Sequence, residues 1–171
     1  GVRHPRNVKA ETVVNKLNKR LARYFGASKV HVKIDDGILS DAAAGSDYIK
    51  VRRGAVFRER DIDIFEVHEG WVHVGTTMNG LQQPYAKWLA KGPPCTTSIQ
   101  EGLAFLMEVF TFVCLPERAL RINNRLIVCD MAENGANILM GFAGIRGAKA
   151  NRFRVCREVA VIVFPSQDPD V

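Results

Sequence analysis

Hydrophobic and polar positions follow two different periods in the first part of the chain. Between residues 8 and 25, apolar side chains recur every three or four positions, which predicts an amphipathic helix ended by Gly26. Residues 29–34 alternate apolar and basic side chains, which is the period of a half-buried strand. Residues 42–45 are interpreted as a connection, and a second short strand is expected at residues 48–51. The pattern therefore predicts a helix followed by a small sheet.

The rest of the chain has a mainly helical pattern. Apolar residues from 57 to about 74 follow the helical period, and the turn-forming residues of 75–84 predict a loop after them. Two further helices are predicted, from Thr96 to about Cys114 and from residue 116 to about residue 133. The minor features expected are a helical turn at 85–89, a breaker at 91–94, an apolar segment at 137–142 and a frayed tail at 165–171. We therefore expect an α+β fold, mainly helical, with a small N-terminal β-sheet.

Length and composition place the chain among globular proteins. The 171 residues suffice for one domain with its own core, and the 47% hydrophobic and 25% charged content is ordinary for such a domain. We therefore expect one domain over residues 1–171. The sequence has no apolar run of bilayer length and no apolar segment typical of a secretion signal, so we expect neither a membrane partner nor secretion.

The cysteine spacing favours a reducing compartment. Cys95, Cys114, Cys129 and Cys156 include no C-x-x-C pair, which argues against a structural zinc knuckle and against a redox dithiol. We interpret them as reduced thiols of a cytoplasmic protein. Cys95 stands in a polar turn and is expected to be exposed, whereas the other three have apolar neighbours and are expected in the core.

The chain is basic, with 24 Lys and Arg against 18 Asp and Glu and a net charge of +6. Such a charge favours encounters with acidic partners of any class. The basic residues are scattered and do not interleave with aromatic residues as in a nucleic-acid-binding module. A nucleic-acid-binding domain is therefore the less favoured alternative, and salt-dependent DNA binding would support it.

The residues that carry candidate chemistry lie in the stretch FEVHEGWVHVGTTMNG. His68, Glu69 and His73 form the pattern H-E-x-x-x-H, which supplies two imidazoles for zinc and a carboxylate that can act as a general base. The two histidines are five positions apart, so a regular helix would point them about 140° apart. Convergence on one ion requires a wider turn such as a π-bulge, which Gly70 would ease by tolerating unusual backbone angles. Without such a turn, both histidines would be ordinary helix residues.

Glu101 has two interpretations. It lies in the word QEGLA and could supply a third ligand. It is also the last residue of Ser98-x-x-Glu101, the pattern of a capping box at a helix start. Taken singly, Glu101 is better explained as a cap than as a ligand, although both roles could hold in part.

Two sequence motifs that lie apart in the chain together favour the metal-binding interpretation. HEGWVHVGTTMNG and TTSIQEGLA, with DAAAGSDYIKVRRG at residues 41–54, resemble the QEGLA-motif family over about residues 10–136. This family includes the microtubule-associated tyrosine carboxypeptidases and bacterial proteins described as flavohemoglobin expression-modulating. The resemblance implies a zincin-like catalytic domain in which His68, His73 and Glu101 bind Zn²⁺ and Glu69 is the general base.

The resemblance also implies a reaction. Peptidase members of the family remove a C-terminal tyrosine from tubulin, so the expected function is a zinc-dependent peptidase, in particular a carboxypeptidase, acting on a peptide or protein substrate with an acidic C-terminal tail. A carboxypeptidase needs a cation for the terminal carboxylate, and Arg118, Arg121 and Arg125 recur at helical spacing, although a solvated basic face is the favoured explanation of these arginines. The alternative function is a non-catalytic, metal-binding regulatory protein that affects gene expression.

The sequence also suggests roles for side chains near the histidines, for the two tryptophans and for the ends of the chain. The side chains considered as second partners of the histidines are Thr76, Thr77, Asn79 and Glu108. Trp71 and Trp88 could be core or substrate-facing. Residues 152–171 depart from the family pattern, and the catalytic region of the family begins upstream of Gly1, so we expect part of a longer domain with a divergent tail.

Overall fold

The computed structural model describes residues 5–135 of the chain. The chain divides into two compact units at Cys114 and Leu115, and each unit is described by itself. Within residues 5–135, no helix is both long enough and apolar enough to cross a bilayer. The predictions of a single domain over residues 1–171 and of a cytoplasmic location stay predictions.

The first unit begins with a short strand that leads directly into a helix. Strand β1 (Val8–Lys9) pairs antiparallel with β5 (Val56–Phe57) and is followed by helix α1 (Ala10–Phe25). The helix starts two residues later than its periodicity predicts, because Val8 and Lys9 are held in the strand pair. Gly26 ends it as predicted, with a φ of 88° that suits glycine. The buried face of α1 consists of Ala10, Val13, Leu17 and Leu21.

A three-stranded sheet follows α1. Its order is β2 (His31–Asp35), β4 (Tyr48–Arg52), β3 (Ala42–Ala44), with β2 parallel and β3 antiparallel to β4. The interpretation of residues 42–45 as a connection is wrong, because three alanines carry no alternation and only the pairing with β4 makes them a strand. One face of the sheet is buried through Val32, Ala42, Ile49 and Val51. Helix α1 packs against this sheet.

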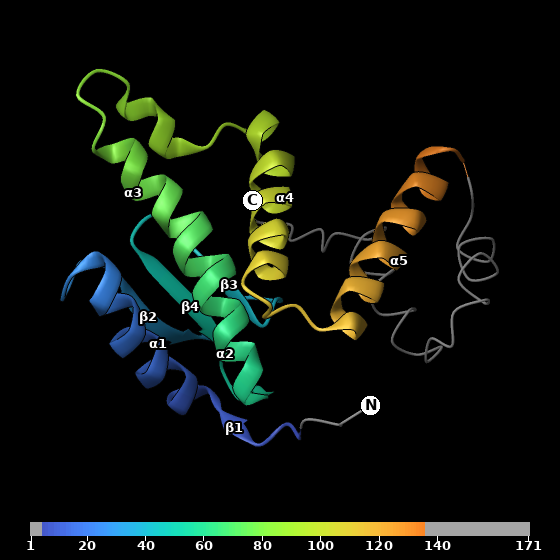
Figure 1. The fold of residues 1–171 in the computed structure, drawn as a ribbon, viewed down its shortest axis with the longest axis horizontal. Coiled ribbons are helices and arrows are strands. Elements are labelled where there is room, and N and C mark those ends of the chain that lie inside the picture. The colour runs from blue at the N-terminus through green and yellow to red at the C-terminus, as the bar shows by residue number, and fades with distance from the viewer. Residues whose placement is uncertain (1–4, 136–171) are drawn as a thin grey trace. The chain divides into compact units, whose positions relative to one another are not determined.

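One long helical rod crosses the sheet beside α1 (Figure 1). It consists of α2 (Glu59–Phe65), the π-helix η1 (Glu66–Val74) and α3 (Gly75–Leu81), joined without a break in helical backbone angles. The loop predicted from residue 75 onward is wrong for Gly75–Leu81, because the rod continues through these turn-forming residues.

Packing at Gly80 explains why a turn former is tolerated there. Gly80 is buried against the 3₁₀ helix η2 (Lys87–Lys91), and a Cβ at this position would lie 2.4 Å from the backbone nitrogen of Ala90. Glycine is therefore needed for the close approach of two helices and not for a turn. The helical turn predicted at residues 85–89 overlaps η2 but is displaced by two residues.

Helix α4 (Pro94–Phe110) packs against η1 and completes the first unit. It starts two residues before the predicted Thr96, because proline is favoured in the first helical turn. It ends at Phe110 instead of Cys114, and Phe112 then takes a positive φ of 57°. Helix α5 (Pro116–Glu133) in the second unit has the predicted bounds.

The architecture confirms the α+β class, whereas the zincin-like assignment stays a prediction. Cys95 is exposed as predicted, but Cys114 and Cys129 are only half-buried and not core residues. The predictions for Cys156 and for residues 137–142 and 152–171 lie outside the described residues.

The two tryptophans occupy different environments. Trp71 packs against the core and meets Tyr24 edge-on, whereas Trp88 is 64% exposed.

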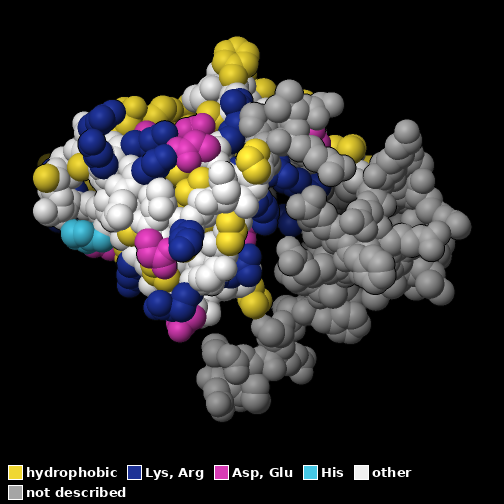
Figure 2. All heavy atoms as spheres, turned by 90° about the horizontal axis from the view of Figure 1, so that it is seen from below, with side chains coloured by type: hydrophobic (Ala, Val, Ile, Leu, Met, Phe, Trp, Pro, Cys, Tyr) yellow, Lys and Arg dark blue, Asp and Glu magenta, His cyan; other side chains and the backbone are white. Residues whose placement is uncertain are grey.

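Figure 2 shows lysine and arginine side chains interspersed with acidic ones on the face in view. The ion pairs that tie basic residues of this unit to acidic ones include Arg6–Asp41, Arg52–Asp41, Lys50–Asp35 and Arg53–Asp36.

Candidate metal centre

The π-helix η1 contains both histidines of the H-E-x-x-x-H pattern. It runs for nine residues, Glu66–Val74, and at its end the backbone N–H of Gly75 donates to the carbonyl of Gly70, five residues earlier. A π-helix bonds residues five apart, so it brings the side chains of His68 and His73 onto one side of the rod. The widened helix predicted from the spacing is confirmed, and it is longer than a single bulge.

Gly70 acts differently from the prediction. Its φ is not in the positive range, so the residue is not needed for an unusual backbone angle. It is buried against α1, where an added Cβ would lie 2.5 Å from Cδ2 of the fully buried Leu21. Glycine at this position therefore permits the close approach of η1 to α1, between the two histidines.

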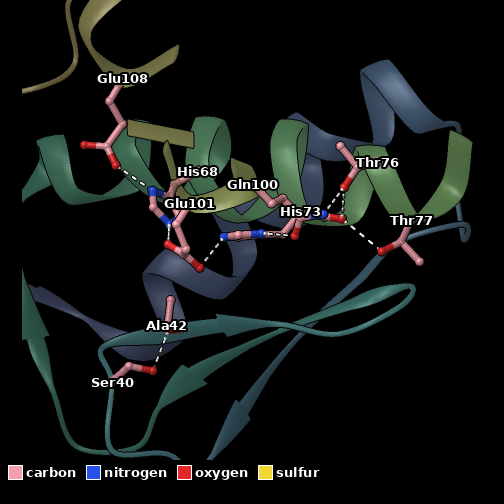
Figure 3. A network of polar contacts seen from close by, with 9 residues as sticks. All are labelled: Ser40, Ala42, His68, His73, Thr76, Thr77, Gln100, Glu101 and Glu108. Atoms are coloured by element: carbon pink, nitrogen blue, oxygen red, sulfur yellow. Dashed lines mark hydrogen bonds and ion pairs between the residues drawn. The ribbon is translucent and has the colours of Figure 1, made fainter. Parts of the chain in front are cut away.

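Three side chains converge on one point (Figure 3). The Nε2 atoms of His68 and His73 each lie 3.3 Å from a different carboxylate oxygen of Glu101 on α4. One potential ligand atom from each of the three residues lies within 4.8 Å of the others. Glu101 approaches from the solvent side and is half-exposed, whereas both imidazoles are largely buried.

The start of α4 decides between the two interpretations of Glu101. The helix begins at Pro94 with Pro93 as its N-cap, so Ser98 and Glu101 lie inside the helix. The capping-box interpretation is therefore wrong, because the amides that it would satisfy are already within the helical ladder. The carboxylate of Glu101 instead faces the imidazoles.

Each imidazole has a second partner at Nδ1. Oε1 of the fully buried Glu108 lies 2.7 Å from Nδ1 of His68. Oε1 of Gln100 lies 2.7 Å from Nδ1 of His73, and its Nε2 donates to Oγ1 of Thr76 at 2.9 Å. These contacts orient both Nε2 atoms toward Glu101, as second partners of metal-binding histidines do.

The sequence identified some of these partners and missed one. Glu108 and Thr76 were candidates and lie in the network. Thr77 was also a candidate, and its hydroxyl donates to the backbone carbonyl of His73, at 3.1 Å, instead of contacting an imidazole nitrogen or Gln100. The exposed Asn79 uses its backbone carbonyl to accept from Gln83. Gln100 is not among the predicted partners, although its place directly before Glu101 in the QEGLA motif is a signal for it.

Burial and the close contacts among these side chains shift their pKa values. Burial opposes the charged form of His68, but hydrogen bonds to Glu101 and Glu108 outweigh it and raise its pKa to about 9. The hydrogen bond to Glu101 raises the pKa of His73 despite burial. The two histidines in turn lower the pKa of Glu101. Glu101 is therefore the carboxylate that both imidazoles contact.

Glu69 lies beside this cluster. Burial raises the pKa of its carboxyl group, and the charges of His68, His73 and Glu101 are close enough to act on it. A hydrogen bond with the backbone of Ala44, on the edge strand β3, opposes this rise. The carboxylate thus combines partial desolvation with a fixed position, which suits a general base.

The donor set fits zinc. Two imidazole nitrogens and one carboxylate oxygen are typical zinc ligands, and three protein ligands leave a position open for water or substrate. The convergence of Nε2 atoms whose rings are held at Nδ1 supports this fit. The other predicted site residues, Arg118, Arg121 and Arg125, lie on α5 in the second unit, and none of them is free of interactions. Their substrate-binding role stays a prediction.

A comparison with models of protein families found a match for this chain. A family model described as microtubule-associated tyrosine carboxypeptidase matches residues 2–159, which include η1 and α4. Neither a curated protein nor a solved structure matches the chain. The match extends over most of the 171 residues and confirms the resemblance seen in the two sequence words. The chain therefore belongs to the microtubule-associated tyrosine carboxypeptidase family.

Proposed function

We propose that the chain is a zinc-dependent peptidase of the carboxypeptidase type that acts on peptide or protein C-termini. The observation that carries the proposal is the convergence of His68, His73 and Glu101 on one point, with Glu69 beside them. Family membership supports the reaction class, because the family is named for a carboxypeptidase.

Zinc would be held by Nε2 of His68, Nε2 of His73 and a carboxylate oxygen of Glu101. When bound, zinc supplies a Lewis acid that polarises a carbonyl group and lowers the pKa of water. The protein contributes rings held in place at Nδ1 and a largely buried pair of imidazoles.

Glu69 performs the proton transfers in this proposal. Its carboxylate accepts a proton from the attacking water and later delivers it to the amine that leaves. A carboxyl pKa raised by burial favours both steps, because the group must bind the proton and then release it. The interaction with Ala44 on β3 holds the carboxylate while it does so.

The proposed substrate is an acidic C-terminal tail in the cytoplasm. A net charge of +6 favours the encounter with such a tail. One or more of Arg118, Arg121 and Arg125 would bind the terminal carboxylate, for which the guanidinium fork is well suited.

The test uses peptides with acidic tails, incubated with zinc-loaded protein and analysed by mass spectrometry for loss of the last residue. Glu69→Gln should keep stoichiometric zinc and lose about 10²- to 10⁴-fold in turnover. Glu66→Gln is the matched control, because Glu66 lies on the same π-helix but pairs with Arg20 at 2.9 Å, and it should stay active.

Three outcomes separate the alternatives. Turnover by Glu69→Gln at the wild-type rate would refute the assigned base. Cleavage of peptides whose C-terminus is amidated would show an endopeptidase. Stoichiometric zinc without cleavage of any peptide would favour the non-catalytic regulatory protein.

A further inference from the structure

We infer that Gln100 and Thr76 are positioning residues that determine which ring nitrogen of His73 carries the hydrogen. This inference rests on the proposed function, in which Nε2 of His73 binds zinc. The hydrogen-bonded circuit that joins Thr76, Gln100 and His73 is called the amide relay below.

The amide relay is a closed circuit that joins three helices. Oγ1 of Thr76 on α3 donates to the backbone carbonyl of His73 on η1, at 3.0 Å. Nε2 of Gln100 on α4 donates to the same Oγ1, at 2.9 Å. Oε1 of Gln100 lies 2.7 Å from Nδ1 of His73, which closes the circuit (Figure 3).

Once the Thr76 hydroxyl donates to the carbonyl of His73, the hydrogen count fixes the remaining donors and acceptors of the circuit. A hydroxyl has a single hydrogen, and Thr76 gives it to the carbonyl of His73, so toward Gln100 the hydroxyl can only accept. Gln100 must therefore present its NH₂ end to Thr76 and its carbonyl end to His73. A carbonyl oxygen only accepts, so Nδ1 of His73 must carry a hydrogen.

The hydrogen on Nδ1 determines which nitrogen of His73 can bind a metal. A neutral imidazole carries one hydrogen, so a hydrogen on Nδ1 leaves the lone pair on Nε2. This is the nitrogen that faces Glu101, at 3.3 Å. The amide relay therefore preselects the tautomer that can bind a metal at the convergence point.

The other imidazole does not need such a device. His68 is paired at Nδ1 with Glu108, and an ionised carboxylate accepts at either oxygen. The side chain of Gln100 has one accepting and one donating end, so a third group must set its orientation. Thr76 supplies that group.

Two neighbouring threonines provide a matched test. Thr76 and Thr77 both donate to the carbonyl of His73, at 3.0 and 3.1 Å, but only Thr76 also accepts from Gln100. Thr76→Val should lower the zinc affinity by about 10- to 100-fold, the usual effect of losing a second partner of a metal-binding histidine. Thr77→Val should keep the wild-type affinity, and Thr76→Ser, which retains the hydroxyl, should restore it. Gln100→Leu should lose at least as much as Thr76→Val.

Zinc affinity is measured by competition with a chromogenic chelator. The second readout is the exchange of the Nδ1 hydrogen of His73 with solvent in the zinc-loaded protein, followed in two-bond ¹H–¹⁵N spectra. This hydrogen should exchange faster in Thr76→Val than in wild type or Thr77→Val. A loss of packing alone would not change the exchange at this one nitrogen selectively.

The outcomes distinguish the relay from the proposed function. Wild-type protein that binds zinc together with a Thr76→Val variant of equal affinity and equal exchange would overturn the relay and leave the proposed function standing. Equal weakening by Thr76→Val and Thr77→Val would also overturn it, because the shared bond to the carbonyl would then be responsible. Wild-type protein that binds no zinc would overturn both proposals.

Discussion

Replacing Gly70 by alanine tests the packing that places the two histidines. A Cβ at this position would lie 2.5 Å from Cδ2 of Leu21, whereas carbon atoms in contact normally stay about 3.5–4.0 Å apart. Leu21 is fully buried, so α1 and η1 must move apart by roughly 1 Å or Leu21 must leave its rotamer. The matched control is Gly102→Ala on α4, where an added Cβ meets no atom within 4 Å.

The magnitudes follow from two opposing terms. Alanine is favoured over glycine in a helix by about 1 kcal/mol, and this gain applies to both variants. Overpacking a core costs about 1–3 kcal/mol and applies only to Gly70→Ala. Gly70→Ala should therefore lose about 0–2 kcal/mol of unfolding free energy, while Gly102→Ala should gain about 1 kcal/mol. The difference between the two variants isolates the overpacking.

Thermal unfolding of the metal-free variants measures this difference. At about 2–4 °C per kcal/mol for a chain of this size, the two melting temperatures should differ by about 2–12 °C. Adding Leu21→Val should reduce the cost of Gly70→Ala, with a coupling of about 0.5–3 kcal/mol. Variants that melt together, or a coupling near zero, would refute the argument that Leu21 excludes a side chain at Gly70.

Three further predictions concern the metal centre and the substrate. Glu108→Gln should keep an acceptor for His68 but remove its charge, and a chelator competition should show zinc affinity about 10-fold lower or more; an unchanged affinity would contradict the role of Glu108. Free zinc at about 100 times its dissociation constant should raise the unfolding free energy by about 2.7 kcal/mol, and a chelator should reverse this in denaturant titrations; a gain that survives chelation would indicate another site. Alanine substitution of Arg118, Arg121 and Arg125, one at a time, should raise KM more than it lowers kcat in at least one variant, and three unchanged KM values would leave these arginines as a solvated face.

Part of the site could be predicted from residue spacing alone. A spacing of five positions between His68 and His73 is incompatible with one ligand face on an α-helix, so a shared metal required a wider helix. The π-helix at Glu66–Val74 fulfils that requirement. The helix expected near residues 57–74 and the bounds of α5 were also predictable, because apolar periodicity is a local property of the chain.

Other features required the tertiary structure. Residues 75–81 contain turn formers, yet they are helical because the rod continues through them and Gly80 packs against η2. Ser98 and Glu101 match a capping box, but Pro94 starts the helix before them. The three alanines of β3 become a strand only through their pairing with β4. In each case the local pattern was overruled by its structural context, which was the continuing rod, an earlier helix start or the pairing with β4.

The arrangement around the two histidines therefore depends partly on residue spacing and partly on tertiary packing. The sequence by itself determined the candidate ligand types, the candidate base beside the first of them and the need for a widened helix, because these depend on residue identity and spacing. Only the tertiary structure decided that Glu101 faces the imidazoles, that Gly70 serves contact with Leu21, and that Gln100 meets Thr76 and His73. These contacts join α4, α1 and α3 to η1, and side-chain contacts between helices depend on packing, which residue spacing along one helix does not specify.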